Sequence, residues 1–293
     1  MPVDDIYSTQ LPLGATRDLW AHIRVHGLES FENGVLNSLN LGLLGFGRVT
    51  LDAAFQSDDR QSFYNEINVV LGGRGFLRFD GREVEMKAGQ VYLFPAGADR
   101  LAHRNASLQK IYFQFRALVN GCELLHRTGP LSAPLPPALG RVLAERLRPG
   151  KPPGLLDIRA QALACLALFS DPLGGMIRGR REHLRSFEPF FNYVAQRLNG
   201  EFSLADFGAR QGLRAKTFAA QFKKAFGESP KKYFLREKLN RLKEALYYSD
   251  RPLGEISEAF GFSDQYYFSR FFKKESGMNP TEFRHSVASV GRK

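Results

Sequence analysis

Short apolar segments separated by turn residues dominate residues 31–118. Their Val, Ile, Leu, Phe and Tyr content predicts β-strands at 38–50, 65–79, 82–86, 90–97 and 108–118. Asp80-Gly81 lies between two of these segments and is typical of a two-residue hairpin turn. The glycines of 72–75 indicate another turn, and Pro95–Gly97 is expected to close a third. Closely spaced antiparallel strands of this kind favour a small barrel or jelly roll.

Helical spacing replaces the strand pattern beyond a Pro-rich connection at 129–138. Two helices are predicted at 138–148 and 155–170. The second is apolar on nearly every side, through Leu155, Leu156, Ile158, Leu163, Leu166 and Leu168. Such a helix either packs on two sides within its own domain or presents a face to a partner. The helix pair is therefore a candidate dimerisation element, with plain intradomain packing as the alternative.

Two adjacent glycines and several arginines characterise residues 171–183. This composition is typical of a flexible linker, so we expect a domain boundary here. The predicted domains are residues 1–170, which contain the strands and the helix pair, and residues 184–293, which are expected to be helical throughout.

The helical part contains one pattern twice, about fifty residues apart. The matched pairs are Leu204/Leu253, Gly212/Gly261, Phe218/Phe268, Phe222/Phe272, Lys223/Lys273, Lys224/Lys274, Gly227/Gly277, Pro230/Pro280 and Tyr233/Phe283. The offset changes from 49 to 50 just after the central glycine. So many matches in a unit of about thirty residues indicate a structural repeat.

Each copy has the spacing of a helix-turn-helix motif. A short helix, at 204–211 or 253–260, is followed by a glycine turn and a second helix, at 215–226 or 264–276. The phenylalanine pairs of the second helices are four residues apart, so each pair is expected to pack against its partner helix.

A long helix is predicted between the two copies. Ser229-Pro230 and Asn279-Pro280 each place a capping residue before a proline at the first helical position, which starts one helix at 230–249 and another after 279. At about 1.5 Å per residue, roughly 18 helical residues of this segment span about 27 Å. Successive major-groove segments on one side of B-DNA lie about 34 Å apart, so both second helices could contact the same side of a duplex.

Composition and charge agree with a nucleic-acid partner. The chain has 293 residues, 43% of them apolar, which can supply a sizeable core. Its formal net charge is +11, of which +7 lies from Gly200 onward, where 18 Lys/Arg face 11 Asp/Glu. Such a surplus suggests a polyanionic partner. No apolar run approaches a membrane span, so no membrane partner is expected, and Cys122 and Cys165 fit a reducing cytoplasm.

Residues 186–285 resemble the DNA-binding domain of the AraC/XylS family of bacterial transcription regulators. The resemblance is carried by "ISEAFGFSDQYYFSRFFKKESGMNPTEFR" at 256–284, and "GRGFLRFDGREVEMKAGQVYLFPAG" at 73–97 is similar to the family's cupin-type sensing domain. It implies an α+β chain: a cupin-like barrel or jelly roll with two following helices, then a seven-helix domain of two helix-turn-helix units.

The same resemblance implies what the chain does. The expected function is a sequence-specific regulator, such as an activator, that binds double-stranded promoter DNA and responds to a small-molecule effector, a sugar or related carbon source. A homodimer and RNA polymerase are the expected protein partners. The alternative is a regulator that binds DNA independently of any effector and whose N-terminal domain has a purely structural role.

Candidate DNA-binding residues follow from helix periodicity. The stripe opposite Phe268 and Phe272 comprises Gln265, Tyr266, Ser269 and Arg270. Gln can pair with adenine and Arg with guanine, although Gln265 could be a solvated amide and Arg270 could contact a phosphate or an internal carboxylate. In the first unit the stripe is Ala215, Lys216, Ala219 and Ala220, so Lys216, Thr217 and phosphate contacts are expected there. Further phosphate candidates, which could instead merely face solvent, are Lys223, Lys224, Lys273 and Lys274.

Candidate effector contacts come from matching strand positions. They are Arg60, Asn68, Arg100 and Tyr112, with Trp20 from the N-terminal segment. The arginines could instead be ordinary surface residues, Tyr112 a core residue and Trp20 a structural anchor. The predicted strands offer only His103 beside Glu66, Glu83 and Glu85, so neither a metal nor another cofactor is expected.

An enzymatic alternative would need reactive cysteines, as in repair proteins with a similar helical domain. The two thiols lie in apolar surroundings without a Cys-x-x-Cys pair, which disfavours an enzyme. An architectural DNA-binding protein without an effector is the other alternative.

Overall fold

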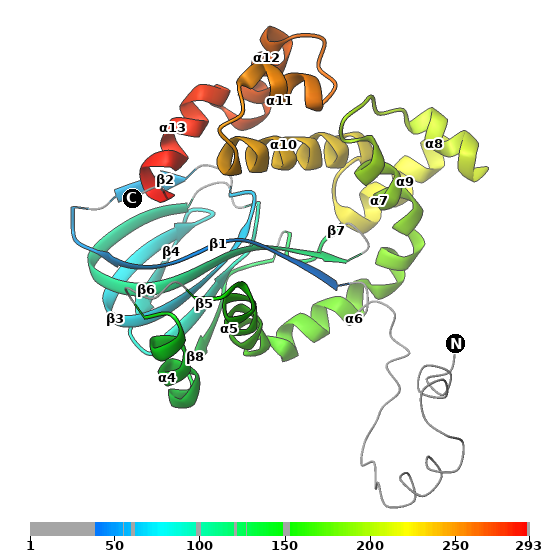
Figure 1. Ribbon diagram of the computed structural model, residues 1–293. Coiled ribbons are helices and arrows are strands. Elements are labelled where there is room, and N and C mark those ends of the chain that lie inside the picture. Colours follow the sequence, from blue (N-terminus) through cyan, green and yellow to red (C-terminus); the bar gives the residue numbers. More distant parts are fainter. Residues whose placement is uncertain are drawn as a thin grey trace, which may run out of the picture. The chain divides into compact units, whose positions relative to one another are not determined.

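The computed structural model describes residues 39–54, 56–59, 62–97, 101–119, 122–126, 128–148 and 153–291 (Figure 1). Within them an antiparallel sheet contains β1 (Leu39–Leu51), β2 (Gln56–Asp59), β3 (Asn65–Phe79), β4 (Arg82–Lys87), β5 (Gln90–Phe94), β6 (Leu101–Val119), β7 (Cys122–Glu123) and β8 (Leu131–Pro134). The strands predicted at 38–50, 65–79 and 82–86 are confirmed to within one residue at each end. Strand β5 is shorter than predicted and β6 begins earlier, at Leu101 instead of residue 108. Strands β2, β7 and β8 were not predicted, and β8 lies where the sequence indicated only a connection.

The strand order is β1-β6-β3-β5-β8, with β2 and β7 pairing with β6 and β4 pairing with β3. Among the described residues β1 and β8 end this path without pairing with each other. The expected antiparallel sheet with following helices is therefore present, whereas closure into a cupin-like barrel is not confirmed.

Two predicted turns have different outcomes. Asp80 and Gly81 have φ values of 46° and 76° and join β3 to β4, as expected of a tight hairpin. The predicted turn at 72–75 is wrong, because β3 continues through it with register shifts against β6. Gly73 has φ 72°, and a Cβ there would collide with the Ser107 carbonyl, so the glycines allow a bulge in a long strand.

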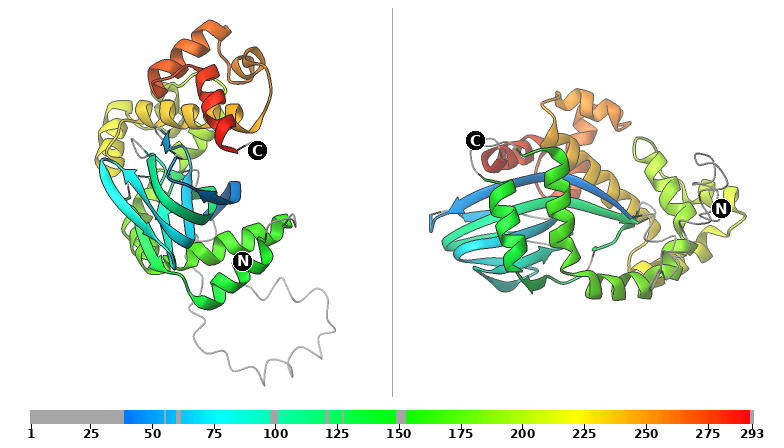
Figure 2. Two further views of the ribbon diagram at one scale, coloured as in Figure 1. Left: turned by 90° about the vertical axis from the view of Figure 1, so that its left-hand side faces the viewer. Right: turned by 60° about the horizontal axis from the view of Figure 1, so that its bottom comes forward.

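Helices α4 (Pro137–Arg146) and α5 (Leu155–Ala167) follow the sheet, close to the predicted pair. Helix α5 lies against one face of the sheet (Figure 2). Ala162 and Leu166 of α5 line a small pocket together with Leu41, Ile67 and Phe115 of the sheet.

Helix α6 (Ser170–Ser186) occupies the segment predicted as a flexible linker. Leu173 and Leu184 near its two ends are buried, which gives the helix tertiary support despite Gly174 and Gly175. The segment is therefore helical rather than a loop. The domain division at this position stays a prediction.

The C-terminal helices match the predicted repeat. They are α7 (Glu188–Arg197), α8 (Leu204–Gln211), α9 (Ala215–Phe226), α10 (Pro230–Tyr248), α11 (Leu253–Ala259), α12 (Gln265–Ser276) and α13 (Pro280–Gly291). Figure 1 shows α7–α9 at one end of α10 and α11–α13 at the other. Helix α10 has 19 residues, so its length is about 28 Å.

Candidate nucleic-acid interface and effector site

Aromatic packing fixes which side of each second helix faces outward. Phe218 and Phe222 of α9 are buried in contact with Phe190 of α7, at ring-centroid distances of 5.2 and 4.9 Å. Phe268 and Phe272 of α12 are completely buried and pack with Phe283 and Leu242. The inward orientation predicted for both pairs is confirmed.

A glycine with positive φ makes the turn in each unit. Gly212 has φ 64° and Gly261 has φ 69°, values that an L-residue with a side chain rarely adopts. At Gly261 a Cβ would also collide with the Asn199 carbonyl oxygen. These turns set α9 against α8 and α12 against α11.

The outward face of α12 carries the predicted base-reading residues. Gln265, Tyr266 and Arg270 are exposed, Tyr266 to 73%, and Ser269 is half-buried. The Arg270 guanidinium lies 5.7 Å from the centre of the Tyr266 ring. Within the described part of the chain Arg270 makes no ion pair, so the alternative of an internal carboxylate partner finds no support.

Asp264 begins α12 and holds its first turn. Its carboxylate accepts a hydrogen bond of 2.6 Å from the Tyr267 N–H. This backbone hydrogen bond, and a weaker contribution from the Ser263 hydroxyl, lowers the pKa of Asp264. The cap fixes the end of the helix that carries Gln265 and Tyr266.

The outward face of α9 is simpler. Lys216, Thr217 and Ala220 are exposed, whereas Ala215 and Ala219 are half-buried. The four predicted phosphate contacts are also exposed, in the last turns of α9 and α12: Lys223, Lys224, Lys273 and Lys274. The outward face of α9 is thus cationic, whereas that of α12 combines aromatic, amide and cationic side chains. Contact with DNA remains a prediction for each of these residues.

Of the five predicted effector contacts, the structure brings two together. Asn68 on β3 and Tyr112 on β6 are directly opposite each other in the ladder. Trp20, Arg60 and Arg100 lie outside the described residues. Burial, and then Tyr247 and Glu66, raise the pKa of Tyr112 to about 12, so its hydroxyl is a neutral hydrogen-bonding group.

A buried polar cluster beside this pair was not predicted. Glu66 on β3 accepts hydrogen bonds from the Lys110 ammonium at 3.3 Å and the Gln114 amide at 3.2 Å. Asn68 is completely buried, and neither its Oδ1 nor its Nδ2 has a partner among the described residues. The Gln114 Oε1 is also buried without a partner there. Because an unsatisfied buried amide is costly, such atoms indicate a place where a polar ligand could bind.

A second buried cluster joins β6 to α10 and was also missed. The Arg116 guanidinium contacts Glu237 at 2.8 Å and Glu244 at 3.1 Å, both on α10, and Glu123 on β7 at 3.2 Å. Burial disfavours the Arg116 charge, but Glu237, Glu123 and Glu244 raise its pKa well above the usual value. Burial likewise opposes ionisation of Glu237, yet Arg116 and Arg236 lower its pKa. Burial raises the pKa of Glu123, although Arg116 and the Asn65 amide oppose that shift. The Arg116–Glu237 pair is therefore ionised and joins β6 to α10.

Three further expectations from the sequence concern a metal site, a membrane span and reactive thiols. The described residues contain no group of three His, Cys, Asp or Glu side chains that could hold a metal, and the side chain of His103 is not described. None of the helices described has the length and apolar character of a membrane span. Cys122 and Cys165 are buried free thiols whose pKa burial raises to about 12, so neither supplies the thiolate that a repair-type enzyme requires.

Comparisons with known proteins agree with this architecture. Residues 208–286 match a family described as a helix-turn-helix domain. A probable transcriptional regulator LumQ of Photobacterium leiognathi is 33% identical over 96 residues, which cover 33% of this chain and 39% of that protein. The match to the MmsAB operon regulatory protein of Pseudomonas aeruginosa covers 36% of that relative, so the chain spans less than two-fifths of either one.

Longer matches reach into the strand region. The arabinose operon regulatory protein of Escherichia coli K12 is 25% identical over 238 residues, covering 74% of this chain and 79% of that protein. Among solved structures, wild-type ToxT from Vibrio cholerae strain SCE256, bound to an unsaturated fatty acid, covers 92% of this chain and all of its own, with a TM-score of 0.54. At 13% identity, this likeness concerns the fold.

Proposed function

We propose that this chain is a bacterial transcription regulator of the AraC/XylS family. In this proposal it binds promoter DNA through α9 and α12 and changes its regulatory state on binding a small molecule. The observation that supports DNA binding is the pair of helix-turn-helix units with buried aromatic faces. Their opposite faces expose Lys216 in one unit and Gln265, Tyr266 and Arg270 in the other. Exposed amide and guanidinium groups on a helix of this kind can reach base edges in a major groove.

The length of α10 supports contacts in consecutive groove segments. At about 28 Å it is close to the roughly 34 Å between major-groove segments on one side of B-DNA. Phosphate contacts by Lys223, Lys224, Lys273 and Lys274 would supply affinity without base preference.

Gel retardation with a library of promoter fragments tests this proposal. We expect a selected fragment to bind at modest ionic strength, with an affinity that falls steeply as salt rises because counterions are released from phosphates. Failure to retard any fragment from a complete library at low salt contradicts the proposal.

We further propose that the effector binds on the sheet face that contains Asn68 and Tyr112. The buried, unpartnered amide of Asn68 supports this assignment, and the Glu66–Lys110–Gln114 cluster beside it offers charged hydrogen-bonding groups. These groups suit a small polar molecule such as a sugar. The unsaturated fatty acid bound to ToxT is a ligand of that protein, which is only 13% identical to this chain.

The Asn68→Leu variant distinguishes between a sheet that binds an effector and a sheet with a purely structural role. If the sheet binds an effector, a compound that raises the melting temperature of the wild-type chain loses its effect on this variant. A ligand at 100 times its Kd stabilises by about 2.7 kcal/mol, which thermal shift resolves. If no compound of a broad carbohydrate panel shifts the wild type and the variant is simply more stable, the alternative of an effector-independent regulator gains support.

We also propose that the chain forms a homodimer through α4 and α5. Leu155, Leu156 and Leu163 of α5 are 61%, 80% and 50% exposed, and Val142 of α4 is 40% exposed. Apolar side chains at this density on adjacent helices are typical of a surface that a partner covers. Equilibrium sedimentation of the wild type and of Leu156→Glu tests this, since a dimer that persists unchanged in the variant contradicts it. A contact with RNA polymerase remains a prediction.

A further inference from the structure

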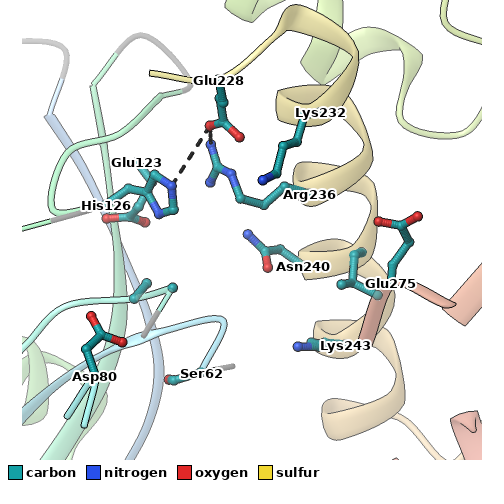
Figure 3. Close-up of a pocket in the computed structure, with 13 residues that line it drawn as sticks. Ser62, Asp80, Glu123, His126, Glu228, Lys232, Arg236, Asn240, Lys243 and Glu275 are labelled. Carbon is teal, nitrogen blue, oxygen red and sulfur yellow. Dashed lines mark hydrogen bonds and ion pairs between the residues drawn. The ribbon is translucent and has the colours of Figure 1, made fainter. Parts of the chain in front are cut away.

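A cavity of about 420 Å³ lies between α10 and the loops at the ends of several strands (Figure 3). Its wall on the strand side includes Ser62, Asp80 and His126. The opposite wall is one face of α10, and Glu228 and Glu275 complete the rim. Neither Asn68 nor Tyr112 is among the described residues that line it.

The α10 wall is a polar stripe. Lys232, Arg236, Asn240 and Lys243 occupy positions i, i+4, i+8 and i+11, which fall on one side of a helix, and Figure 3 shows their side chains along the same edge of the cavity. Arg236 is already paired, with Glu228 at 2.9 Å and Glu237 at 2.7 Å. Its charge is therefore neutralised within the protein.

Two other members of the stripe are available to a ligand. The side chains of Lys232 and Asn240 make no hydrogen bond or ion pair with any residue that the structure describes. Lys243 is almost completely buried, with its ammonium 5.9 Å from the Phe283 ring centre, and its side chain extends toward the cavity (Figure 3). A buried ammonium and a free amide on one wall favour an anionic group.

The rest of the lining argues for hydroxyl groups and against an aliphatic chain. Among the described residues that line it, only Ala96 and Leu239 contribute apolar side chains. Asp80 and Glu275 offer carboxylate oxygens, which accept hydrogen bonds from hydroxyls. Glu123 and Glu228, the other two carboxylates of the wall, are held by Arg116 at 3.2 Å and Arg236 at 2.9 Å.

We propose that this cavity binds a small hydroxylated anion, either a sugar acid or a sugar phosphate. Its carboxylate or phosphate would lie among Lys232, Asn240 and Lys243, and its hydroxyls would donate to Asp80 and Glu275. The volume accommodates a molecule of this size.

Such a site has a direct mechanical consequence. Helix α10 joins the two helix-turn-helix units, and its Glu237 connects Arg236 at the cavity to Arg116 on β6. A ligand that contacts both walls would stabilise the arrangement in which α10 is held to the strands. The resulting change in DNA binding rests on the proposed function, but ligand binding itself does not.

Calorimetric titration of the full chain tests the site with three probes: gluconate, glucose 6-phosphate and neutral glucose. We expect at least one of the two anions to bind and glucose to bind at least about tenfold more weakly, because hydrogen bonds to a charged group are stronger than those between neutral groups. Lys232→Ala and Asn240→Ala should each weaken binding of that anion by about tenfold or more. Lys231→Ala is the matched control, because Lys231 is an exposed lysine of the same helix turn outside the cavity lining.

The outcomes separate the possibilities. Binding of gluconate alone or of glucose 6-phosphate alone supports the site and identifies the acid group. Equal binding of glucose and the anions, no binding at millimolar concentration, or equal affinity of Lys231→Ala and Lys232→Ala overturns the proposal. Gel retardation without any ligand reports on DNA binding independently, so a negative titration with normal retardation refutes this site alone.

Discussion

The two helix-turn-helix units share a backbone plan and differ on the surface. Each has a glycine of positive φ in its turn, two buried phenylalanines on its second helix and a left-handed glycine after it, Gly227 or Gly277. The outward faces have little in common, since α9 presents Lys216 among alanines and α12 presents Gln265, Tyr266 and Arg270. The repeat therefore preserves what determines the fold and leaves the exposed face free to vary.

The difference suggests a division of labour between the units. A lysine among alanines can contact phosphates and thymine methyl groups but forms no bidentate bond to a base. Glutamine and arginine can form such bonds. We therefore predict that α12 contributes most of the base discrimination and that α9 contributes mainly affinity.

The largest effects are expected where the units are alike. Phe222→Ala and Phe272→Ala each remove a completely buried ring, and each should lower the free energy of unfolding by about 3–5 kcal/mol. Chemical denaturation followed by circular dichroism measures both. Similar losses would confirm that the cores are equivalent, whereas a loss confined to one variant would show that the repeat conceals two different packing arrangements.

This equivalence was predictable because it depends on local spacing. Phenylalanines four residues apart, a glycine turn and a Ser-Pro or Asn-Pro start define each unit within about thirty residues. The long helix α10 followed from the same signals. The contacts of its Glu237 and Glu244 with Arg116 did not, because Arg116 lies on a strand more than a hundred positions away.

The buried polar face of the sheet escaped prediction for a physical reason. Along β6, Lys110, Tyr112, Gln114 and Arg116 alternate with Ile111, Phe113 and Phe115. Such alternation normally indicates a strand with one face in water. Here Lys110, Gln114 and Arg116 are buried. Their burial is favourable because they pair with Glu66, Glu237 and Glu244 on distant segments and with Glu123 on the adjoining strand.

The linker at 171–183 was mispredicted for a related reason. Two glycines and a proline weaken helix propensity, but Pro172 lies in the first turn of α6, where proline is tolerated. Burial of Leu173 and Leu184 supplies tertiary support that residue composition does not reveal.

The Arg116→Ala variant tests whether the ion pairs of Arg116 hold α10, the helix between the two units, to the strands. The change leaves Glu123 and Glu237 buried without their main partner, which should cost about 3–5 kcal/mol of unfolding free energy. Arg241→Ala is the control, because it removes an exposed contact with Glu244 and should cost less than about 1 kcal/mol. Thermal denaturation compares the two, and equal losses would contradict a structural role for the Arg116 cluster.

Arg270→Ala and Lys216→Ala compare the two faces directly. We expect Arg270→Ala to relax preference at one base pair by about 1–3 kcal/mol, and Lys216→Ala to weaken binding to all sequences while reducing its salt dependence. Selection from an operator library, read out by sequencing, measures both. If only Lys216→Ala relaxes base preference, the assignment of discrimination to α12 is wrong.

The smallest predicted difference concerns how the helices begin. Ser203 caps α8 through the Asp206 N–H at 3.0 Å, and Pro252 before α11 provides no such bond. In the second helices the order is reversed, because Asp264 caps α12 and Arg214 does not cap α9. Ser203→Ala should cost about 1 kcal/mol of unfolding free energy at every pH, because a hydroxyl does not titrate.

Asp264→Ala should instead have a pH-dependent effect. The lowered pKa of Asp264 means that the carboxylate stabilises the folded chain above its unfolded-state pKa, and this contribution is lost as the pH falls below about 4. Urea denaturation between pH 7 and pH 3 should therefore show the difference between wild type and Asp264→Ala shrinking with acid, while the Ser203→Ala difference stays constant. Parallel curves for all three proteins would show that the Asp264 cap does not stabilise α12 through its charge.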